Sequence, residues 1–153
     1  MNDTDTNVGG WPATTIRTFV NNDIYNALPS ELQNAIIDTT VVSGHGSTSG
    51  ESNFTSNDKL YLLAPKEIYS DFNLVNDTAK DLTRTLDYYT NIGVTTSSYS
   101  GAIKKSGTSA DNWWLRAVNS NIALSFFVVI DNGNWTNTSA SNTNGVAPAF
   151  RLG

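Results

Sequence analysis

The side chains able to do acid–base or nucleophilic chemistry are few and scattered. His45 is the only imidazole of the chain, and it lies in the stretch "SGHGST". Catalysis by a serine or threonine nucleophile needs a base within hydrogen-bond reach, and that base needs a partner to orient it. Nothing beside His45 supplies such a partner, so we expect a loop residue there.

Paired carboxylates are the second kind of chemistry that the residue types allow. Glu67, Asp71, Asp81 and Asp87 all lie on segments with a helical pattern, where a solvated helix surface carries charge by default. A hydrolase using Glu67 and a second carboxylate stays an alternative, and it would need the pair less than about 10 Å apart in a cleft. The prediction is that the protein is not an enzyme and has no catalytic residue.

Metal and phosphate chemistry find little support in the motifs. The segment "DFNLVND", residues 71–77, offers oxygen ligands at Asp71 and Asn73, but Val75 stands at the next ligand position and no turn glycine follows. With no cysteine and one histidine, a structural zinc site is not expected. The glycines within residues 44–50 do not follow a strand and open a helix, as a phosphate loop would. We therefore expect no metal and no cofactor.

Composition narrows the class of protein. The 153 residues, 39% of them hydrophobic, suffice for one domain with its own core. A net charge of -5 argues against a nucleic-acid partner, which requires clustered Lys and Arg. No apolar run reaches the roughly 18 residues of a membrane helix, and Met1–Gly10 is too polar for a signal sequence, so membrane insertion is not expected. Only 15% of residues are charged while Asn, Thr and Ser abound, as in many secreted and virion proteins.

The elements that must position any site follow from hydrophobic periodicity. Residues 1–8 have only Val8 to bury and are expected to be a flexible tail. Spacings of three and four predict helices, and β-branched or alternating patterns predict strands. The helices are expected over residues 11–28, 30–37, 65–72 and 78–92, and the strands over residues 39–43, 58–64, 122–130 and 146–152, with a loop over residues 44–57.

The C-terminal half carries the strongest strand signals. An alternating apolar run over residues 122–130 ends at Asn132-Gly133, a frequent hairpin turn. In "NWWLRA", adjacent tryptophans of a strand face opposite ways, and Arg116 is expected to pair with a carboxylate. We predict one α+β domain over residues 9–153, with N-terminal helices packed on antiparallel strands from the C-terminal half.

Three stretches together resemble a known domain family: "KLYLLAPKEIY" at 59–69, "NWWLRA" at 112–117 and "GVAPAFRL" at 145–152. They are similar to a family of bacterial and phage surface proteins with "L-L-S-x-x-E-I", "W-W-L-R-S" and closing "G-V-R-P-A-F" motifs. That family is identified as a member of the C-type-lectin-like superfamily, alongside the variable proteins of diversity-generating retroelements. The resemblance implies a C-type-lectin-like fold from Gly9 onward.

This chain departs from those motifs at two positions. Ala117 replaces the usual Ser, and Ala147 replaces the usual Arg, so any role of that arginine is lost. The Glu-Pro-Asn and Trp-Asn-Asp triplets of calcium-dependent sugar sites do not occur, so such binding is not implied. Formylglycine-generating enzymes share the superfamily's fold but need a cysteine that this chain lacks.

The polar stretch "DNGNWTNTSASNTNG", residues 131–145, is the candidate binding surface. Apolar residues flank it on both sides, so its backbone is tethered at both ends. Amides and hydroxyls give adaptable hydrogen bonds, and a tryptophan gives a large rigid contact area. Trp135 is the expected anchor, and the other contact residues are expected to be Asn119, Asn121, Asn132, Asn134, Asn137, Thr138, Ser139, Asn142 and Asn144.

The predicted function is non-enzymatic ligand recognition at the receptor-binding end of a viral tail fibre or a microbial surface adhesin. The partner would be a surface protein or glycan of a host or neighbouring cell, and the place extracellular, on a virion or a cell surface. The resemblance implies a retroelement-diversified segment, because residues 119–144 are largely types that adenine mutagenesis of Asn codons produces. Plain loop composition explains the same residues. A fixed-sequence adhesin and a structural spacer stay open as alternatives.

Overall fold

Short helices fill much of the first third of the chain, and short antiparallel strands recur along its whole length. The structure is a computed structural model that describes residues 1–47 and 50–153. Its helical elements are η1 (Trp11–Ala13), α1 (Thr15–Phe19), η2 (Val20–Ile24), α2 (Tyr25–Ala27), α3 (Ser30–Ala35), α4 (Pro65–Ile68), η3 (Lys80–Leu82), α5 (Asp87–Asn91) and η4 (Ser100–Ala102). Its strands are β1 (Ile36–Ile37), β2 (Thr39–Ser43), β3 (Phe54–Asp58), β4 (Lys104–Ser106), β5 (Ser109–Asp111), β6 (Trp113–Val118), β7 (Ser125–Val129), β8 (Trp135–Ser139) and β9 (Arg151–Leu152).

The first helical stretch agrees with the prediction from periodicity. The Thr14 hydroxyl caps α1 by accepting from the Arg17 amide at 3.1 Å. Helical backbone then continues through η2, a single π turn, to the end of α2. Leu28 is extended, as a residue before proline must usually be, and Pro29 separates α2 from α3.

Two predicted segments in the middle of the chain are wrong in detail. The expected loop over residues 44–57 contains β3, which pairs with β2 in antiparallel register from Thr39↔Asp58 to Ser43↔Phe54. The expected strand over residues 58–64 is mostly buried, but beyond Asp58, which ends β3, it pairs among the described residues only at the Tyr61↔Ala149 bridge. Tertiary pairing therefore decided which of the two segments became a strand.

The expected helix over residues 78–92 is also corrected. Helical backbone is confined to η3 and α5, and the Leu86 backbone between them is extended. The Leu86 amide donates to the Glu67 carbonyl at 2.9 Å, which draws this segment onto the end of α4. The Leu82 side chain is consequently exposed instead of sharing a buried helix face with Leu86.

The core centres on the three-stranded sheet β6–β7–β8, with β7 in the middle. Every residue of β6 and β7 is buried, including Trp113 and Trp114, so both faces of these two strands are covered, whereas the residues of β8 are half-buried. The strand begins only at Ser125, and the apolar residues Ile122 and Leu124 before it are exposed. The predicted hairpin follows: Gly133 has φ 91°, and a Cβ there would overlap the Tyr99 carbonyl oxygen.

The N-terminal residues 1–8 pack against the C-terminal half, which corrects the expected flexible tail. Met1 is buried, and its amine donates to the Ala140 carbonyl at 2.7 Å. The fully buried Asn7 amide donates to three main-chain carbonyls within residues 119–125. Apart from the buried Met1 side chain, main-chain hydrogen-bond acceptors hold this segment, so hydrophobicity could not reveal it.

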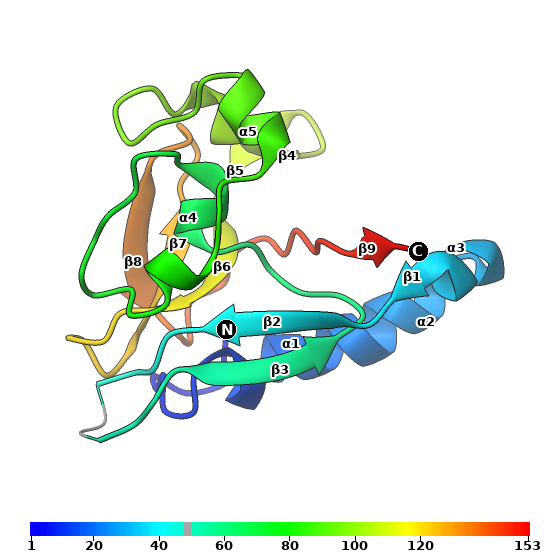
Figure 1. Ribbon diagram of the computed structural model, residues 1–153, viewed down its shortest axis with the longest axis horizontal. Helices are drawn as coiled ribbons and strands as arrows, with labels where there is room; N and C mark the ends of the chain where they lie inside the picture. Colours follow the sequence, from blue (N-terminus) through cyan, green and yellow to red (C-terminus); the bar gives the residue numbers. More distant parts are fainter. Residues whose placement is uncertain (48–49) are drawn as a thin grey trace.

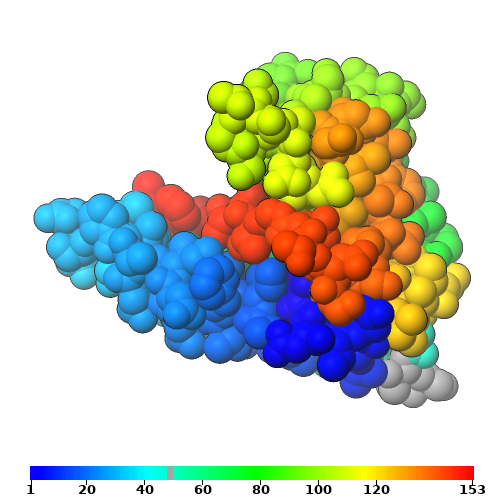
Figure 2. All heavy atoms as spheres, turned by 180° about the vertical axis from the view of Figure 1, so that it is seen from behind, coloured from blue at the N-terminus to red at the C-terminus, as the bar shows by residue number. Residues whose placement is uncertain are grey.

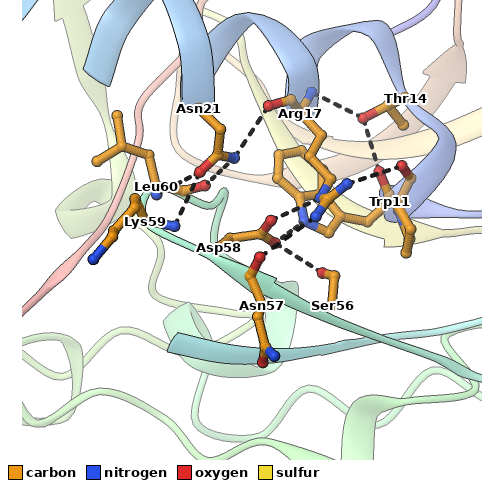
Figure 3. Close-up of polar contacts among 10 residues, drawn as sticks. Trp11, Thr14, Arg17, Asn21, Ser56, Asn57, Asp58, Lys59 and Leu60 are labelled. Carbon is orange, nitrogen blue, oxygen red and sulfur yellow. Dashed lines mark hydrogen bonds and ion pairs between the residues drawn. The ribbon is translucent and has the colours of Figure 1, made fainter. Parts of the chain in front are cut away.

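A buried carboxylate ties the N-terminal helices to β3. Asp58 accepts from Trp11 Nε1 at 2.9 Å, Ser56 Oγ at 2.8 Å and Arg17 Nε at 2.7 Å (Figure 3). The Asn21 side chain adds a second tie, because its Oδ1 accepts from the amides of Lys59 and Leu60. Because three donors satisfy a buried carboxylate, the network has a structural role.

The architecture is α+β, and the part of the chain that the structure describes forms four small antiparallel sheets. Figure 1 shows the N-terminal helices running alongside β3 in one part of the molecule, while β6–β7–β8, α4 and α5 form the other. The N-terminal helices are tied to β3 and the residues after it by the side chains of Trp11, Arg17 and Asn21. Of these helices, η1 also contacts β6 of the central sheet. Across residues 1–47 and 50–153, no helix has both the length and the apolar character to span a membrane.

Candidate ligand-binding site

Strand β8 is an edge strand that pairs with β7, and its alternating side chains present two different faces. Its register with β7 includes Val128↔Thr136 and Phe127↔Asn137. Cross-strand partners share a face of the sheet, so Thr136 and Thr138 lie on the Val128 face. Trp135 lies on the opposite face, with Phe127.

A hollow of about 370 Å³ opens on the Val128 face, and we call it the polar hollow. Val128 and Ile130 give it an apolar part, and the other lining residues carry amides or hydroxyls. Those seven are Asn112, Thr136, Asn137, Thr138, Asn142, Thr143 and Asn144. Asn137 is paired with Phe127, so its side chain belongs to the opposite face of β8. None of the lining residues is ionisable, so the hollow can bind by hydrogen bonds and apolar contact but supplies no acid or base.

The loop that closes the polar hollow is anchored at both ends. On one side the Asn142 amide nitrogen donates to the Ser139 carbonyl at 3.0 Å, and its side chain donates to Thr138 Oγ1. On the other side the Gly145 amide donates to the Asn112 carbonyl at 2.8 Å. A short anchored loop presents its side chains in a fixed arrangement, which lowers the entropy cost of binding. Asn144 Nδ2 is buried and has no hydrogen-bond partner among the described residues.

Trp135, the expected anchor of the binding surface, packs against the hydrophobic core, and we call its face of β8 the framework face. Its ring lies 5.1 Å from the Phe72 ring, edge-on at 82°, and 5.8 Å from the Phe127 ring. The side chain is half-buried against the core. The strand's alternation turns the Trp135 side chain away from the polar hollow, so the predicted ligand contact at Trp135 lies outside this site and stays a prediction.

Two further predicted contact residues belong to the connection between β6 and β7. Asn119 is only 2% exposed, and its Oδ1 accepts from the Asn121 amide at 3.0 Å. The exposed Asn121 side chain donates to Asn76 Oδ1 at 2.9 Å. Neither residue lines the polar hollow, and Asn119 is too buried to touch a ligand.

The remaining predicted residues divide between turn and hollow. Asn132 Oδ1 accepts from the Asn134 amide, and Asn134 Oδ1 accepts from the next amide, so both asparagines serve the β7–β8 turn. Ser139 pairs with Ser125 on the Trp135 face. The structure does bring four predicted residues together in the hollow: Asn137, Thr138, Asn142 and Asn144.

Sequence reasoning missed three residues of the polar hollow. Thr136 and Thr143 lie within the polar stretch of residues 131–145. The alternation of β8 places Thr136 on the same face as Thr138. Asn112 comes from the start of β6, where no local signal marks it. It reaches the site only because Gly145 returns to pair beside Trp113.

A second, smaller hollow of about 240 Å³ shares Asn112 with the first and lies under the β4–β5 hairpin. Lys104 Nζ sits 4.8 Å from the centre of the Trp113 ring, a cation–π arrangement. Burial lowers the pKa of the Lys104 ammonium from its ordinary value. Figure 2 shows the hairpin standing over the red-orange closing segment, with β8 in orange beside them.

The carboxylates considered for hydrolysis are engaged elsewhere. Glu67 forms a buried ion pair with Arg116, and it also accepts from the Ala64 amide at 2.7 Å. This confirms the expected structural role of Arg116. Asp71 accepts from Thr96, while Asp81 and Asp87 pair with neighbouring basic side chains. In residues 1–47 and 50–153 no three His, Asp or Glu side chains gather as metal ligands would.

Comparison with known proteins assigns a family to this arrangement. The chain belongs to the family described as a domain of unknown function, DUF6273, which matches residues 1–153. No curated protein and no solved structure matches the chain. The C-type-lectin-like assignment therefore stays a prediction.

Proposed function

We propose that this protein is a non-enzymatic ligand-recognition domain with a C-type-lectin-like fold, and that the polar hollow is its contact surface. One observation carries the proposal. Amide and hydroxyl residues line a hollow beside Val128 and Ile130, and Thr136 and Thr138 face it from β8, while the other face of β8 packs into the core through Trp135. Recognition sites are commonly built in this way, from variable side chains on a rigid frame.

The chemistry of the hollow suits a ligand rich in hydroxyl or amide groups. Asparagine and threonine side chains both donate and accept, so they match such groups without a charge. Each hydrogen bond contributes about 0.5–1.5 kcal/mol net, and several are needed for useful affinity. The partner class that fits is a surface glycan or a surface protein of a host or neighbouring cell.

The place of action follows from the resemblance and the composition. The three motifs resemble those of bacterial and phage surface proteins, and only 15% of the residues are charged. We assign the domain to the receptor-binding end of a viral tail fibre or to a microbial surface adhesin, outside the cell or on a virion. Diversification of its coding segment is a separate proposal. A near-copy of that segment, differing only at adenines and lying beside a reverse transcriptase gene, would support it, and a neighbourhood without one would favour a fixed sequence.

A glycan and protein array tests the proposal, followed by affinity measurements on the hits. The double variant Asn142→Ala/Thr143→Ala removes two polar side chains from the rim of the hollow. Loss of two net hydrogen bonds should weaken binding about tenfold or more.

The matched control is Asn34→Ala, the same truncation at an exposed position on α3. It should bind as the wild type does. An array without hits would favour a structural spacer over a binder. Hits that the double variant retains in full would show that the ligand binds away from the polar hollow.

A further inference from the structure

Three of the four arginines of this chain line one hollow, which shares no residue with the polar hollow. We call it the arginine hollow. It has a volume of about 310 Å³, at the small end of the roughly 300–1,000 Å³ of small-molecule sites. Arg116 on β6, Arg84 before α5 and Arg151 on β9 reach it from three distant parts of the chain.

The lining carries net positive charge on a protein of net charge -5. Glu67 is the single carboxylate of the lining, and its ion pair with Arg116 satisfies both. Arg116 also donates from Nε to the Val42 carbonyl at 3.0 Å and from Nη1 to the Leu62 carbonyl at 2.7 Å. These bonds fix the Arg116 guanidinium and its Glu67 partner in the wall of the hollow, so Arg84 and Arg151 carry the charge that can meet a ligand.

Those two arginines are available at low cost. Arg84 pairs with Asp87 at 2.9 Å, but both side chains are nearly four-fifths exposed, and such pairs contribute about 0–1 kcal/mol. Arg151 is the exposed first residue of β9 and forms no ion pair with the described residues. Either guanidinium can turn toward an anion without breaking a strong contact.

Two hydroxyls in the wall of the hollow are also uncommitted. Thr39 Oγ1 and Thr83 Oγ1 are buried and have no hydrogen-bond partner among the described residues. Thr39 as a whole is only 3% exposed. Buried polar atoms are nearly always paired, so two unpartnered hydroxyls in one lining point to a ligand that accepts from them.

We propose that the arginine hollow binds a small oxyanion, the carboxylate or phosphate group of a soluble ligand. The planar guanidinium fork matches the two oxygens of a carboxylate or a phosphate, and hydroxyl donors complete the set. This site stands on different residues from the recognition surface. It would bind whether or not the polar hollow does.

NMR titrations of the intact protein with inorganic phosphate and, separately, with succinate test the proposal at constant ionic strength. Saturable shifts are expected at the amides of Thr39, Thr83 and Arg151. Arg151→Gln and Thr39→Val should each lower the affinity, the arginine change by about tenfold, because a hydrogen bond to a charged group contributes about 1.5–3 kcal/mol. Lys105→Gln is the matched control, since it removes one positive charge at an exposed position of β4 and should change nothing.

The two probes distinguish the source of the oxyanion. Saturation by phosphate alone, by succinate alone or by both would support the site and name its ligand group. Linear shifts without saturation, or equal affinity in the wild type and Arg151→Gln, would overturn it. Because Arg151 is exposed, the glutamine variant should fold, which keeps the second outcome readable.

Discussion

The two faces of β8 differ in what they contribute to the molecule. On one face, Trp135 packs edge-on against Phe72 and near Phe127, and it joins the core. On the other face, Thr136 and Thr138 line the polar hollow with the loop at residues 142–144. Along β8, residues that pack in the core thus alternate with residues that line the proposed contact surface. The position of a residue in β8, more than its type, therefore decides whether its side chain packs in the core or lines the contact surface.

Truncating the framework face should have the largest effect. Trp135→Ala removes a half-buried indole from an aromatic cluster, and we expect a loss of about 2–4 kcal/mol in the free energy of unfolding. Thr136→Ala, the next residue on the other face, should cost about 0.5 kcal/mol or less. Urea unfolding monitored by circular dichroism measures both. Equal losses of unfolding free energy in the two variants would contradict the difference between the two faces of β8.

A change of pH should alter the stability of the fold but not the ligand affinity of the polar hollow. Burial raises the pKa of Asp77 from 3.8 to about 6, so the native carboxyl holds its proton more tightly than the unfolded one. The stability from this group is complete below pH 3.8 and is lost as the pH rises through about 6. Asp77→Asn should flatten this part of the stability profile and, at pH 7, stabilise the protein by about 1–3 kcal/mol.

Urea unfolding at several pH values between 4 and 7 checks the effect of Asp77. An unchanged pH profile in Asp77→Asn would contradict it. Ligand affinity of the polar hollow should stay constant over the same range, because none of its lining residues is ionisable. A steep change in affinity there would place a charged group in the contact surface.

The smallest effect on stability is expected within the polar hollow itself. Thr138→Val keeps the β-branched shape that suits a strand and removes only the hydroxyl that accepts from Asn142. The unfolding free energy should change by about 0.5 kcal/mol or less. Ligand affinity should fall a few-fold, which isothermal titration calorimetry would show. A stability loss near that of Trp135→Ala would show that Thr138 supports the fold rather than the contact surface.

Local patterns were enough to predict some of these features. Helical spacing and the proline at residue 29 indicated the first helical stretch, and Asn132-Gly133 indicated the β7–β8 turn. The pairing of Arg116 with a carboxylate was also predictable, because a buried charge must be neutralised. Each of these features is encoded within a few residues or follows from the free-energy cost of burying an unpaired charge.

The features that were not predictable depend on pairing between distant segments. The polar residues of β3 form a strand because β2 pairs with them, and Asp58 is held by Trp11 and Arg17. Trp135 stands among polar residues in the sequence, and only the pairing Val129↔Trp135 assigns its ring to the core. Asn112 joins the hollow through the returning Gly145 for the same reason.

One measurement tests most directly whether folding is independent of the contact surface. The variant Thr136→Val/Thr138→Val/Asn142→Ala/Thr143→Ala removes four polar groups from the polar hollow at once and leaves the Trp135 face intact. Its free energy of unfolding in urea should stay within about 1 kcal/mol of the wild type, since each surface change costs little. A loss equal to that of Trp135→Ala would show that the hollow's side chains hold the fold together and would contradict the recognition account.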